Sequence, residues 1–337
     1  MRIHILFSFR DGPWGGCNQF LKALRKSFLA SKIYSHQVIS ADIILFDSFN
    51  NLFMVLYFKL RYPNKFFFHR IDGPISIYRG KDLIVDKIIH RFSRFISDGV
   101  VFQSNYSAKQ NFQLGMIKPS NYTVISNTPD STIFYPPSLH QSTHGKVRIV
   151  ANSWSTHANK GFSVYSFLDS NLDFSCYEFI FVGNSPSSFQ NIIHIPPLSS
   201  KELANILRSS QLYLTASKHE SCSNSLLEAI ACGLTPIAIN SGGNPELVGD
   251  SGFLFTGTDD ILSTIDLAAT KVLTKPLPTL SIDKVASRYY TFFQNVVANA
   301  ESPTRLTLIQ GFHLLLTAIF HRLYLRLSRF ISFPIHR

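Results

Sequence analysis

Short apolar runs alternate with longer stretches of helical spacing in the N-terminal part of the chain. The apolar runs are RIHILFS, DIILFDS, KFFFH and GVVFQS, and the helical stretches are NQFLKALRKSFLAS, KDLIVDKIIHRFSRF and SAKQNFQLG. Apolar runs that alternate with helical stretches are typical of buried parallel strands in βαβ units. This part of the chain is therefore predicted to form a parallel sheet covered by helices.

The same alternation begins again after a segment with a different character. The segment YPPSLHQSTHGK, residues 135–146, contains prolines and polar residues without apolar periodicity, which is typical of a linker. Beyond it, the expected strands are VRIVANS, EFIFVGN, QLYLTAS and LTPIAIN, and the expected helices include GFSVYSFLDSNL, SKELANILRSS and DDILSTIDLAATKV. Two doubly wound α/β domains in tandem are predicted, with ligands bound at the carboxyl ends of the strands.

The last 37 residues, 301–337, have a pattern of their own. A mostly apolar stretch follows Arg305, and Arg322, Arg326 and Arg329 then follow at helical spacing. Gln310 and His313 interrupt an apolar stretch that is already short for a membrane span. An interfacial amphipathic helix is the favoured interpretation, and a helix packed on the protein itself is the alternative.

Length, composition and charge narrow the class of protein. A chain of 337 residues with 45% hydrophobic and 16% charged residues is globular and long enough for two domains. The net charge of +11 is concentrated at the ends, because residues 1–150 carry 19 Lys and Arg against 8 Asp and Glu, whereas residues 151–300 carry 8 against 12. No zinc-finger, RNA-recognition or basic-zipper pattern accompanies this charge, so an anionic membrane surface is favoured over nucleic acid.

The cysteines and the N-terminus indicate an intracellular protein. Cys17, Cys176, Cys222 and Cys232 form no CxxC pair, so neither a disulfide framework nor a zinc site is predicted. The first apolar stretch, Ile3 to Phe9, is much shorter than a secretion signal requires. We expect a cytoplasmic protein, with peripheral contact to the inner face of the membrane through the tail.

The stretch HESCSNSLLEAIACG, residues 219–233, combines a polar loop with a short helix. The helix is expected from about Asn224 to Cys232, closed by Gly233, which places Glu220 in the loop and Glu228 in the helix. The loop could direct backbone N–H groups and hydroxyls at a phosphate bound to the helix N-terminus. The alternative needs no ligand, because Ser225 and Glu228 also match a capping box.

This stretch resembles the retaining glycosyltransferases of family 4, the glycosyl transferases group 1 type that includes glycogen synthase, whose signature is two glutamates separated by seven residues. The resemblance continues through ACGLTPIAINSGGNPELVGDSGFLF and includes VISNTPDSTIFYPP, NKGF, FVGNSP and IIHIPPLSSKELANIL in the expected order. It covers roughly residues 98–260, and several linked motifs are more specific than one.

The resemblance implies an α/β protein with the GT-B fold, in which two facing Rossmann-like, doubly wound domains enclose a central cleft. Residues 1–140 would be the acceptor-binding domain and residues 141–280 the nucleotide-sugar-binding domain. Residues 281–300 would form a helix that returns to the N-terminal domain, and residues 301–337 a basic amphipathic tail. The implied reaction is transfer of a sugar, with retention, from a nucleotide diphosphate-sugar to a glycan or lipid-linked acceptor, without an essential metal, in bacterial surface-polysaccharide synthesis.

The same resemblance implies roles for individual residues. Lys160 would hold the donor phosphates, Glu220 would contact hydroxyls of the transferred sugar, and Glu228 would contact the ribose. The predicted catalytic residues are Glu220, His69, Asp72 and Lys160. The predicted donor-binding residues are Gly15, Gly16, Ser153, Lys160, Gly183, Asn184, Pro197, Leu198, Glu220, Ser221, Cys222, Ser223, Asn224, Ser225, Leu226 and Glu228.

Two candidates in the N-terminal domain have structural alternatives. His69 ends a buried strand and is expected to face the cleft, yet it also fits an interior histidine. Asp72 is its alternative in the site, or part of an Asp-Gly turn. Arg70 between them is either a ligand-binding cation or a solvated side chain.

The chain departs from the family pattern at two places. Ser221, Cys222 and Ser223 replace a glycine-rich loop, and no arginine precedes Lys160, so Ser153, Trp154, His157 or a basic residue of the first domain would take that role. Two other functions remain open: a nucleotide-sugar epimerase of the same fold, and a sugar-nucleotide-binding protein without turnover.

Overall fold

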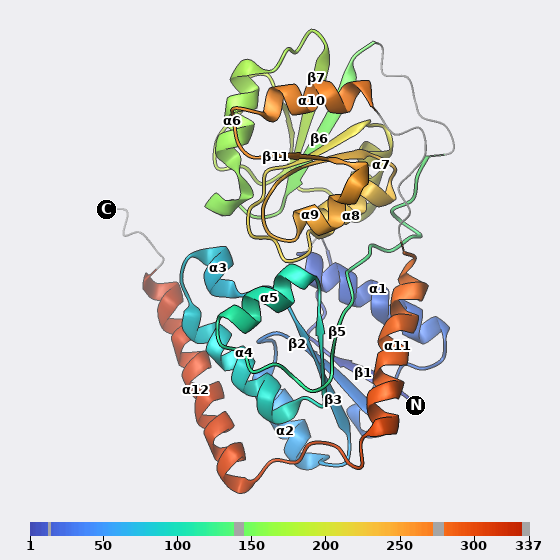
Figure 1. The fold of residues 1–337 in the computed structure, drawn as a ribbon, viewed down its shortest axis with the longest axis vertical. Coiled ribbons are helices and arrows are strands. Elements are labelled where there is room, and N and C mark those ends of the chain that lie inside the picture. The colour runs from blue at the N-terminus through green and yellow to red at the C-terminus, as the bar shows by residue number, and fades with distance from the viewer. Residues whose placement is uncertain (13–14, 138–144, 272–279, 332–337) are drawn as a thin grey trace.

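The computed structural model describes residues 1–12, 15–137, 145–271 and 280–331. Two α/β domains lie end to end, each with a parallel sheet between layers of helices (Figure 1). The predicted linker, residues 135–146, falls largely outside the described residues.

The first sheet is built from the predicted apolar runs. Its strands are parallel and neighbouring in sequence order: β1 (Ile3–Leu6), β2 (Ile43–Asp47), β3 (Phe66–Ile71), β4 (Gly99–Phe102) and β5 (Tyr122–Val124). An isolated parallel bridge also joins Ile3 to Tyr34. Tyr34 therefore lies on one side of β1 and β2 on the other. The chain steps first to one side of β1 and then to the opposite side, as a doubly wound fold requires.

Helices cover both faces of this sheet. Helix α1 (Gly16–Ala30) packs on one face through buried apolar residues such as Phe20 and Leu24. The other face is covered by α2 (Leu52–Arg61) and α4 (Leu83–Ile96). The short α3 (Ile75–Arg79) and the longer α5 (Asn105–Gln113) follow β3 and β4. The sequence pattern does not predict α2, because its residues are apolar on most sides and show no clear helical periodicity.

The second sheet has the strand order β11-β10-β9-β6-β7-β8. Its strands are β6 (Val147–Ser153), β7 (Tyr177–Gly183), β8 (Ile193–Ile195), β9 (Leu212–Thr215), β10 (Thr235–Ile239) and β11 (Phe253–Phe255). Its helices are α6 (Phe162–Asn171), α7 (Ser200–Arg208), α8 (Asn224–Ala231), α9 (Asn244–Val248) and α10 (Ile261–Thr270). The order reverses at β6, so the predicted doubly wound topology is confirmed here as well.

The last two helices return to the N-terminal domain. Helix α11 (Ile282–Asn299) packs on α1, and six of its residues are buried, among them Tyr289 and Phe293. Helix α12 (Leu308–Ile331) lies along α2 and α4 (Figure 1). Among the described helices, none combines the length and apolar character that a bilayer crossing requires.

Polar contacts join the two domains where their strand ends face each other. The backbone N–H of Gly73 donates to Ser221 Oγ at 2.7 Å, and Asn127 Nδ2 donates to Asn224 Oδ1 at 3.0 Å. On another side, the carboxylate of Glu246 accepts from the backbone N–H groups of Asn105 and Tyr106, at 2.9 and 2.6 Å. The loops that follow the strands of both domains therefore enclose one shared cleft.

Candidate active site

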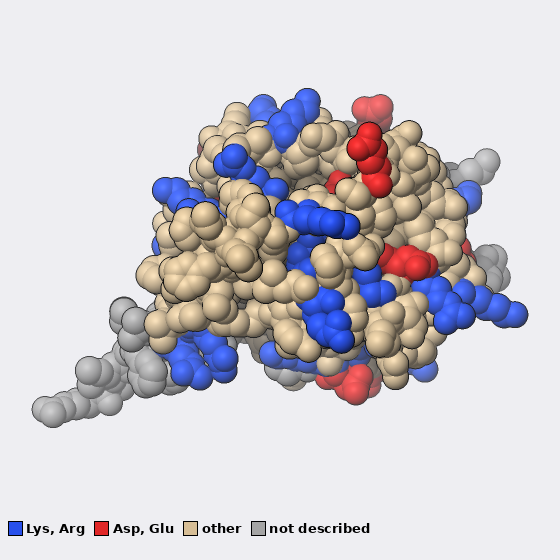
Figure 2. All heavy atoms as spheres, turned by 90° about the horizontal axis from the view of Figure 1, so that it is seen from below, with Lys and Arg blue, Asp and Glu red and all other residues tan. Residues whose placement is uncertain are grey.

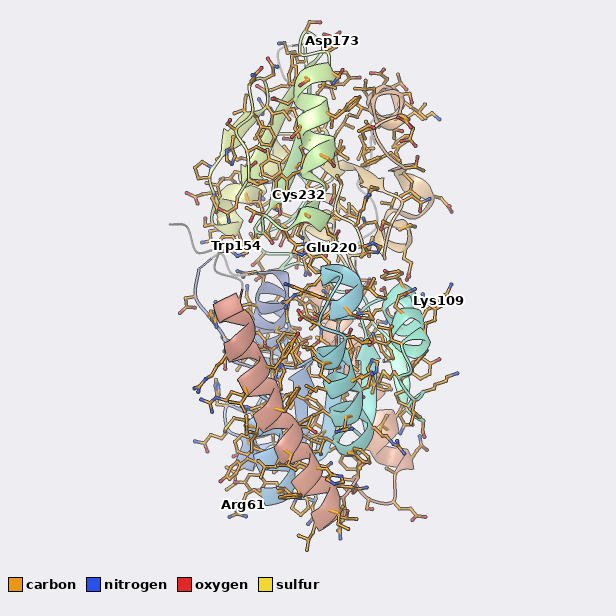
Figure 3. The ribbon with its side chains drawn as sticks, turned by 90° about the vertical axis from the view of Figure 1, so that its left-hand side faces the viewer. Arg61, Lys109, Trp154, Asp173, Glu220 and Cys232 are labelled. Carbon is orange, nitrogen blue, oxygen red and sulfur yellow. The ribbon has the colours of Figure 1, made fainter. Side chains whose placement is uncertain are left out.

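The interdomain cleft is lined by both domains. Figure 3 shows Trp154 and Glu220 at the level where the domains meet. The N-terminal domain contributes the start of α1, and the C-terminal domain contributes the ends of β6 and β7, the loop after β9, and α8. The lining residues are Gly15, Gly16, Gln19, Asn152, Ser153, Trp154, Lys160, Val182, Gly183, Pro197, Leu198, Ser200, Leu203, Glu220, Cys222, Ser223, Asn224, Ser225 and Glu228.

Glu220 is held by a constrained stretch of backbone. The preceding residue, His219, has a φ of +58°, a conformation that costs free energy in a residue with a side chain. The carbonyl of Glu220 accepts from the N–H of Gly243 at 2.6 Å, and a side chain on Gly242 would clash with the backbone of Glu220. This stretch is therefore fixed tightly enough to orient the carboxylate toward the cleft.

The carboxylate of Glu220 forms an ion pair with the proposed phosphate-binding lysine. Its Oε1 atom lies 2.6 Å from Lys160 Nζ and accepts from Ser217 Oγ at 2.6 Å. Burial acts to lower the pKa of Lys160, but the Glu220 carboxylate and the Tyr78 phenol outweigh it, so the pKa is raised. Lys160 therefore carries a full positive charge at neutral pH.

The loop that presents Lys160 contacts the other domain. A short 3-10 turn, Ala158–Lys160, ends at Gly161, where a side chain would clash with Ala216. Asn159 Nδ2 donates to the carbonyl of Tyr78, whose ring centroid lies 5.7 Å from Lys160 Nζ. The ring of Tyr78 also stacks on His157 at 5.2 Å. Helix α3 thus touches the lysine loop from the opposite side of the cleft.

The start of α8 differs from the predicted capping box. Ser223 is the N-cap, and its Oγ accepts from the N–H of Leu226 at 3.4 Å. Ser225 lies inside the helix, so the capping-box interpretation of Ser225 and Glu228 is wrong. Glu228 lines the cleft instead, and burial raises the pKa of its carboxyl to about 8. The predicted helix end at Gly233 is confirmed, with a φ of +88°.

Two helices begin at the cleft. Gly15 is the N-cap of α1, and a side chain on Gly16 would clash with the side chain of Asn224 at the start of α8. Glycine at this position therefore lets the two helix N-termini approach each other. Because each N-terminus carries partial positive charge, this part of the cleft favours an anion.

A buried charge network lies behind the cleft in the N-terminal domain. Arg70 is fully buried and its Nη1 lies 2.5 Å from Asp47 Oδ1 and 3.2 Å from Asp72 Oδ1. Its Nη2 donates to Asn127 Oδ1 at 2.9 Å, and Asn127 in turn contacts Asn224 of α8. The interpretation of Arg70 as a solvated side chain is wrong, since the guanidinium is fully buried.

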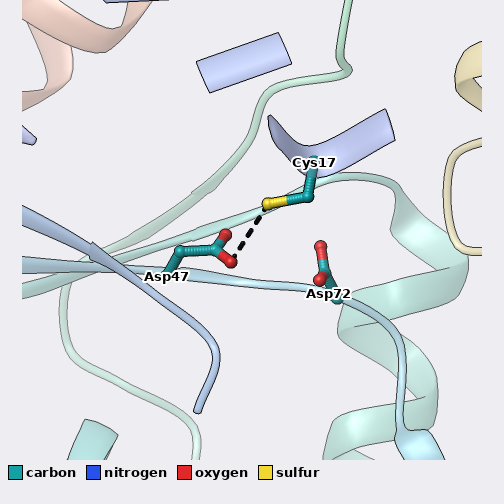
Figure 4. Close-up of side chains that lie close together, drawn as sticks. All are labelled: Cys17, Asp47 and Asp72. Carbon is teal, nitrogen blue, oxygen red and sulfur yellow. Dashed lines mark hydrogen bonds between the residues drawn. The ribbon is translucent and has the colours of Figure 1, made fainter. Parts of the chain in front are cut away.

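Cys17, Asp47 and Asp72 form one compact group of possible metal ligands among the described residues (Figure 4). Their ligand atoms lie within 4.8 Å of one another, and Cys17 Sγ donates to Asp47 Oδ2 at 3.2 Å. The guanidinium of Arg70 contacts both carboxylates and compensates one of their two negative charges. Burial raises the pKa of the Cys17 thiol well above its usual range, which disfavours the thiolate that binds metals.

The structure places His69 in the interior of the N-terminal domain. Its Nε2 pairs with the carbonyl of Ser48 at 2.9 Å, and its ring stacks on Phe46 at 4.1 Å. Burial lowers the pKa of His69 to about 4, so the ring is neutral. The expectation that it faces the cleft is wrong, because His69 lies two residues before the end of β3 and alternation along the strand turns its side chain to the face covered by α2 and α4. Asp72 is nearer the domain interface, and burial together with Asp47 raises the pKa of its carboxyl to about 6.

Most of the other predicted residues lie in or beside the cleft. Asn184, Ser221 and Leu226 stand next to the lining: Asn184 donates to the carbonyl of Trp154 at 2.7 Å, Ser221 contacts Gly73, and Leu226 is buried in the core. The remaining predicted donor-binding residues all line the cleft. Trp154 does so too, whereas His157 stacks on Tyr78.

Sequence reasoning missed several residues of the site. Gln19 and Asn152 line the cleft, and each lies within four positions of a predicted residue, so the same motifs could have indicated them. Ser217 bonds Glu220 from three positions earlier in the same loop. Tyr78 had no such signal, because only the approach of the two domains places α3 beside Lys160.

The comparisons with known proteins agree with this architecture. Residues 172–269, which include Glu220 and Glu228, match the family Glycosyl transferases group 1. The C-terminal domain is thus of the glycosyl transferases group 1 type. No curated protein sequence matches the chain significantly.

Solved glycosyltransferase structures share the fold of the whole chain. Sucrose-phosphate synthase from Thermosynechococcus elongatus superposes with a TM-score of 0.70 at 13% identity, over 89% of this chain and 100% of that one. Anabaena HepE, in complex with UDP-glucose, gives 0.63 at 14% identity, over 88% and 98%. The lipopolysaccharide outer core galactosyltransferase WaaB gives 0.58 at 14% identity, over 88% and 99%. The predicted GT-B fold is confirmed.

Proposed function

We propose that this protein is a retaining glycosyltransferase that moves a sugar from a nucleotide diphosphate-sugar to a glycan or a lipid-linked acceptor. The observation that carries the proposal is the ion pair of Lys160 and Glu220, which lies in the cleft into which the N-termini of α1 and α8 also point. Cation and helix N-termini together suit a diphosphate, and the adjacent carboxylate suits the hydroxyls of a sugar.

Each member of the pair has a separate task in this mechanism. The diphosphate of the donor would form an ion pair with the ammonium of Lys160, and the Glu220 carboxylate would thereby be released from its pair with Lys160. Lys160 and the first turn of α8 would then stabilise the negative charge that develops on the departing diphosphate. Glu220 would accept hydrogen bonds from hydroxyls of the transferred sugar and so orient its anomeric carbon.

Glu228 would hold the nucleotide end of the donor. It lies in α8, one turn past the start of the helix at Asn224, and its raised pKa keeps the carboxyl protonated at neutral pH. A neutral carboxyl both donates and accepts hydrogen bonds, which matches the hydroxyls of a ribose. Pro197 and Leu198, which line the same cleft, offer apolar surface beside the base.

The wider role follows from the same site and from the charge of the chain. We propose a cytoplasmic enzyme of cell-surface polysaccharide synthesis that works at the inner face of the membrane and needs no metal. The cation that a metal would supply is provided by Lys160. The basic N-terminal domain favours an acceptor or surface with negative charge.

The test is binding and slow hydrolysis of UDP-, GDP- and ADP-sugars by the purified protein, beginning with UDP-glucose. We expect one preferred donor, whose hydrolysis persists in EDTA and gives a sugar of unchanged anomeric configuration by NMR. Glu220→Gln should lower the hydrolysis rate by roughly a hundredfold with donor affinity nearly unchanged. Lys160→Met should weaken donor binding as well. Glu178→Gln, a glutamate remote from the cleft, is the matched control.

Three outcomes would contradict the proposal. One is the absence of binding to every donor in the panel. Another is hydrolysis that is insensitive to both Glu220→Gln and Lys160→Met while thermal unfolding shows each variant folded. Conversion of one nucleotide sugar into another without release of sugar would identify an epimerase instead.

A further inference from the structure

Helix α12 has apolar side chains on two opposite faces. One face is buried against the N-terminal domain and includes Gly311, Leu314, Ala318 and His321. The other face is exposed and consists of Leu308, Ile309, Phe312, Leu315, Leu316, Ile319, Phe320 and Leu323. A helix that is apolar all round is normally covered on every side. The tail therefore packs on the protein, as the alternative interpretation proposed, and still leaves a large apolar face without a partner among the described residues.

The exposed apolar face extends onto α2. Met54, Tyr57 and Leu60 are 45%, 55% and 52% exposed and recur every three residues along that helix. A side chain on Gly311 would meet Leu60 at ordinary van der Waals distance, so Leu60, itself one of these exposed residues, adjoins α12. We name these exposed residues of α2 and α12 together the apolar face. Contiguous apolar patches of this extent on a protein surface usually mark an interaction site.

The charges around the apolar face are positive. The sequences of α2 and α12 contain no Asp or Glu, whereas Arg61, Arg322 and Arg326 are exposed at their ends. Arg305 is exposed just before α12, and Arg322 lies over the ring of Phe53. Viewed from the end of the N-terminal domain, Lys and Arg side chains are spread over the surface and acidic ones gather in few places (Figure 2).

We propose that the apolar face docks on an anionic lipid bilayer, with its leucines and phenylalanines in the headgroup boundary and its arginines on lipid phosphates. Apolar side chains flanked by arginines, on two helices whose own sequences carry no acidic residue, match such a surface. A second protein copy would bring the same arginines together, which like-charge repulsion disfavours.

One end of the apolar face lies close to the cleft in the fold. The link between docking and acceptor binding that we draw from this position rests on the proposed function. Tyr324 in the second half of α12 donates to Asp82 at 2.5 Å, and Asp82 lies in the short link between α3 and α4. Helix α3 carries Tyr78, which contacts the lysine loop of the cleft. Docking would therefore bring the cleft close to the bilayer surface, where a lipid-linked acceptor is presented.

The experiment is co-sedimentation of the full chain with vesicles of phosphatidylcholine alone or mixed equally with phosphatidylglycerol. We expect binding to the mixed vesicles that weakens as salt rises. The triple variant Phe312→Glu, Leu316→Glu, Leu323→Glu should lower the bound fraction at least roughly tenfold. Its matched control is Ile39→Glu, Ile117→Glu, Leu267→Glu, which adds the same charge at comparably exposed apolar positions elsewhere. Arg322→Gln with Arg326→Gln should reduce binding to the mixed vesicles only.

Donor hydrolysis in solution separates this proposal from the proposed function. The triple variant should hydrolyse donor at the rate of the unaltered chain, which also shows that it is folded. If the protein binds vesicles but hydrolyses no donor, the proposed docking surface would stand and the proposed glycosyltransferase activity would fail. Equal vesicle binding by the triple variant and its control would overturn the docking surface. A second result would also overturn it: the unaltered chain forms a dimer by light scattering and does not bind vesicles, and the triple variant is monomeric.

Discussion

At the scale of single residues, the site is organised by charges that compensate each other. Lys160 and Glu220 form an ion pair in the cleft, and Arg70 with Asp47 forms another behind it. Both pairs are drawn from segments far apart in the sequence. The first pair must open to admit a ligand, and its two members are both about one-fifth exposed, which suits exchange of partners. The second is fully buried and can only be structural, because removing either partner leaves an unpaired charge inside.

The raised pKa of Glu228 leads to a prediction about how stability depends on pH. Its pKa of about 8 in the folded chain lies above the ordinary value of 4.5, so the folded state holds the proton more tightly than the unfolded state. The contribution to stability is complete below pH 4.5 and is lost as pH rises through 8. In urea unfolding without donor, Glu228→Gln should therefore be about 5 kcal/mol more stable than the unaltered chain at pH 9, and within about 1 kcal/mol of it at pH 5.

The control for this experiment is Glu301→Gln, which removes the same charge at an exposed position. It should leave the pH profile of stability unchanged. Parallel pH profiles for Glu228→Gln and the unaltered chain would show that the carboxyl of Glu228 is already ionised at neutral pH, and would remove the argument that it binds ribose as a neutral group.

At the scale of elements, helix N-termini connect the two domains. Ser104 is the N-cap of helix α5. The next two backbone N–H groups, of Asn105 and Tyr106, donate to the carboxylate of Glu246 on α9 of the other domain. Helices α1 and α8 meet with their N-termini at Gly16 and Asn224. Partial positive charge at helix starts thus serves both the joining of the domains and the site itself.

The contact of Glu246 with α5 should favour the closed arrangement of the domains. Glu246→Gln removes the charge and one of the two acceptor oxygens, which should weaken closure by about 0.5–2 kcal/mol. We expect a larger radius of gyration by small-angle X-ray scattering and several-fold weaker donor binding. Glu202→Gln is the matched control, because Glu202 forms a capping box within α7 of one domain. An equal radius of gyration for Glu246→Gln and the control would refute a role in closure.

At the scale of the whole molecule, the chain returns to its first domain at the end. Helix α11 covers α1 and shares a core with the first sheet, while the C-terminal domain is inserted between the two parts in sequence. The N-terminal domain therefore depends on the whole chain for its folding. Helix α12 then extends that domain and supplies the apolar face.

Truncation tests this dependence. A chain of residues 1–280 loses α11 and exposes the core residues of α1, such as Phe20 and Leu24. Burial of the six residues of α11 contributes about 10 kcal/mol, which is comparable with the stability of a domain. We expect rapid proteolysis of the N-terminal domain in 1–280 and resistance in the matched chain 1–300. Equal resistance of both chains would show that the first domain folds without α11.

Sequence alone determined the class of the fold and the local parts of the site. Apolar runs between helical stretches specify parallel strands, because a strand buried on both faces needs apolar residues throughout, and loops at the carboxyl ends of such strands specify where a ligand binds. Residues close together in the chain, such as Glu220 and Glu228 or the loop before Lys160, were indicated by these loops together with the resemblance to family 4, and most of them line the cleft.

Only the tertiary structure decided which distant residues act together. Tyr78 approaches Lys160, Glu246 reaches α5, and Arg70 turns into a buried network, because the two sheets meet at their strand ends. The orientation of His69 depended on which face of β3 its position occupies, and the N-cap of α8 on which of three nearby serines the backbone selected. Packing also decided that α12 buries one apolar face and exposes the other, since periodicity is the same on both sides of that helix.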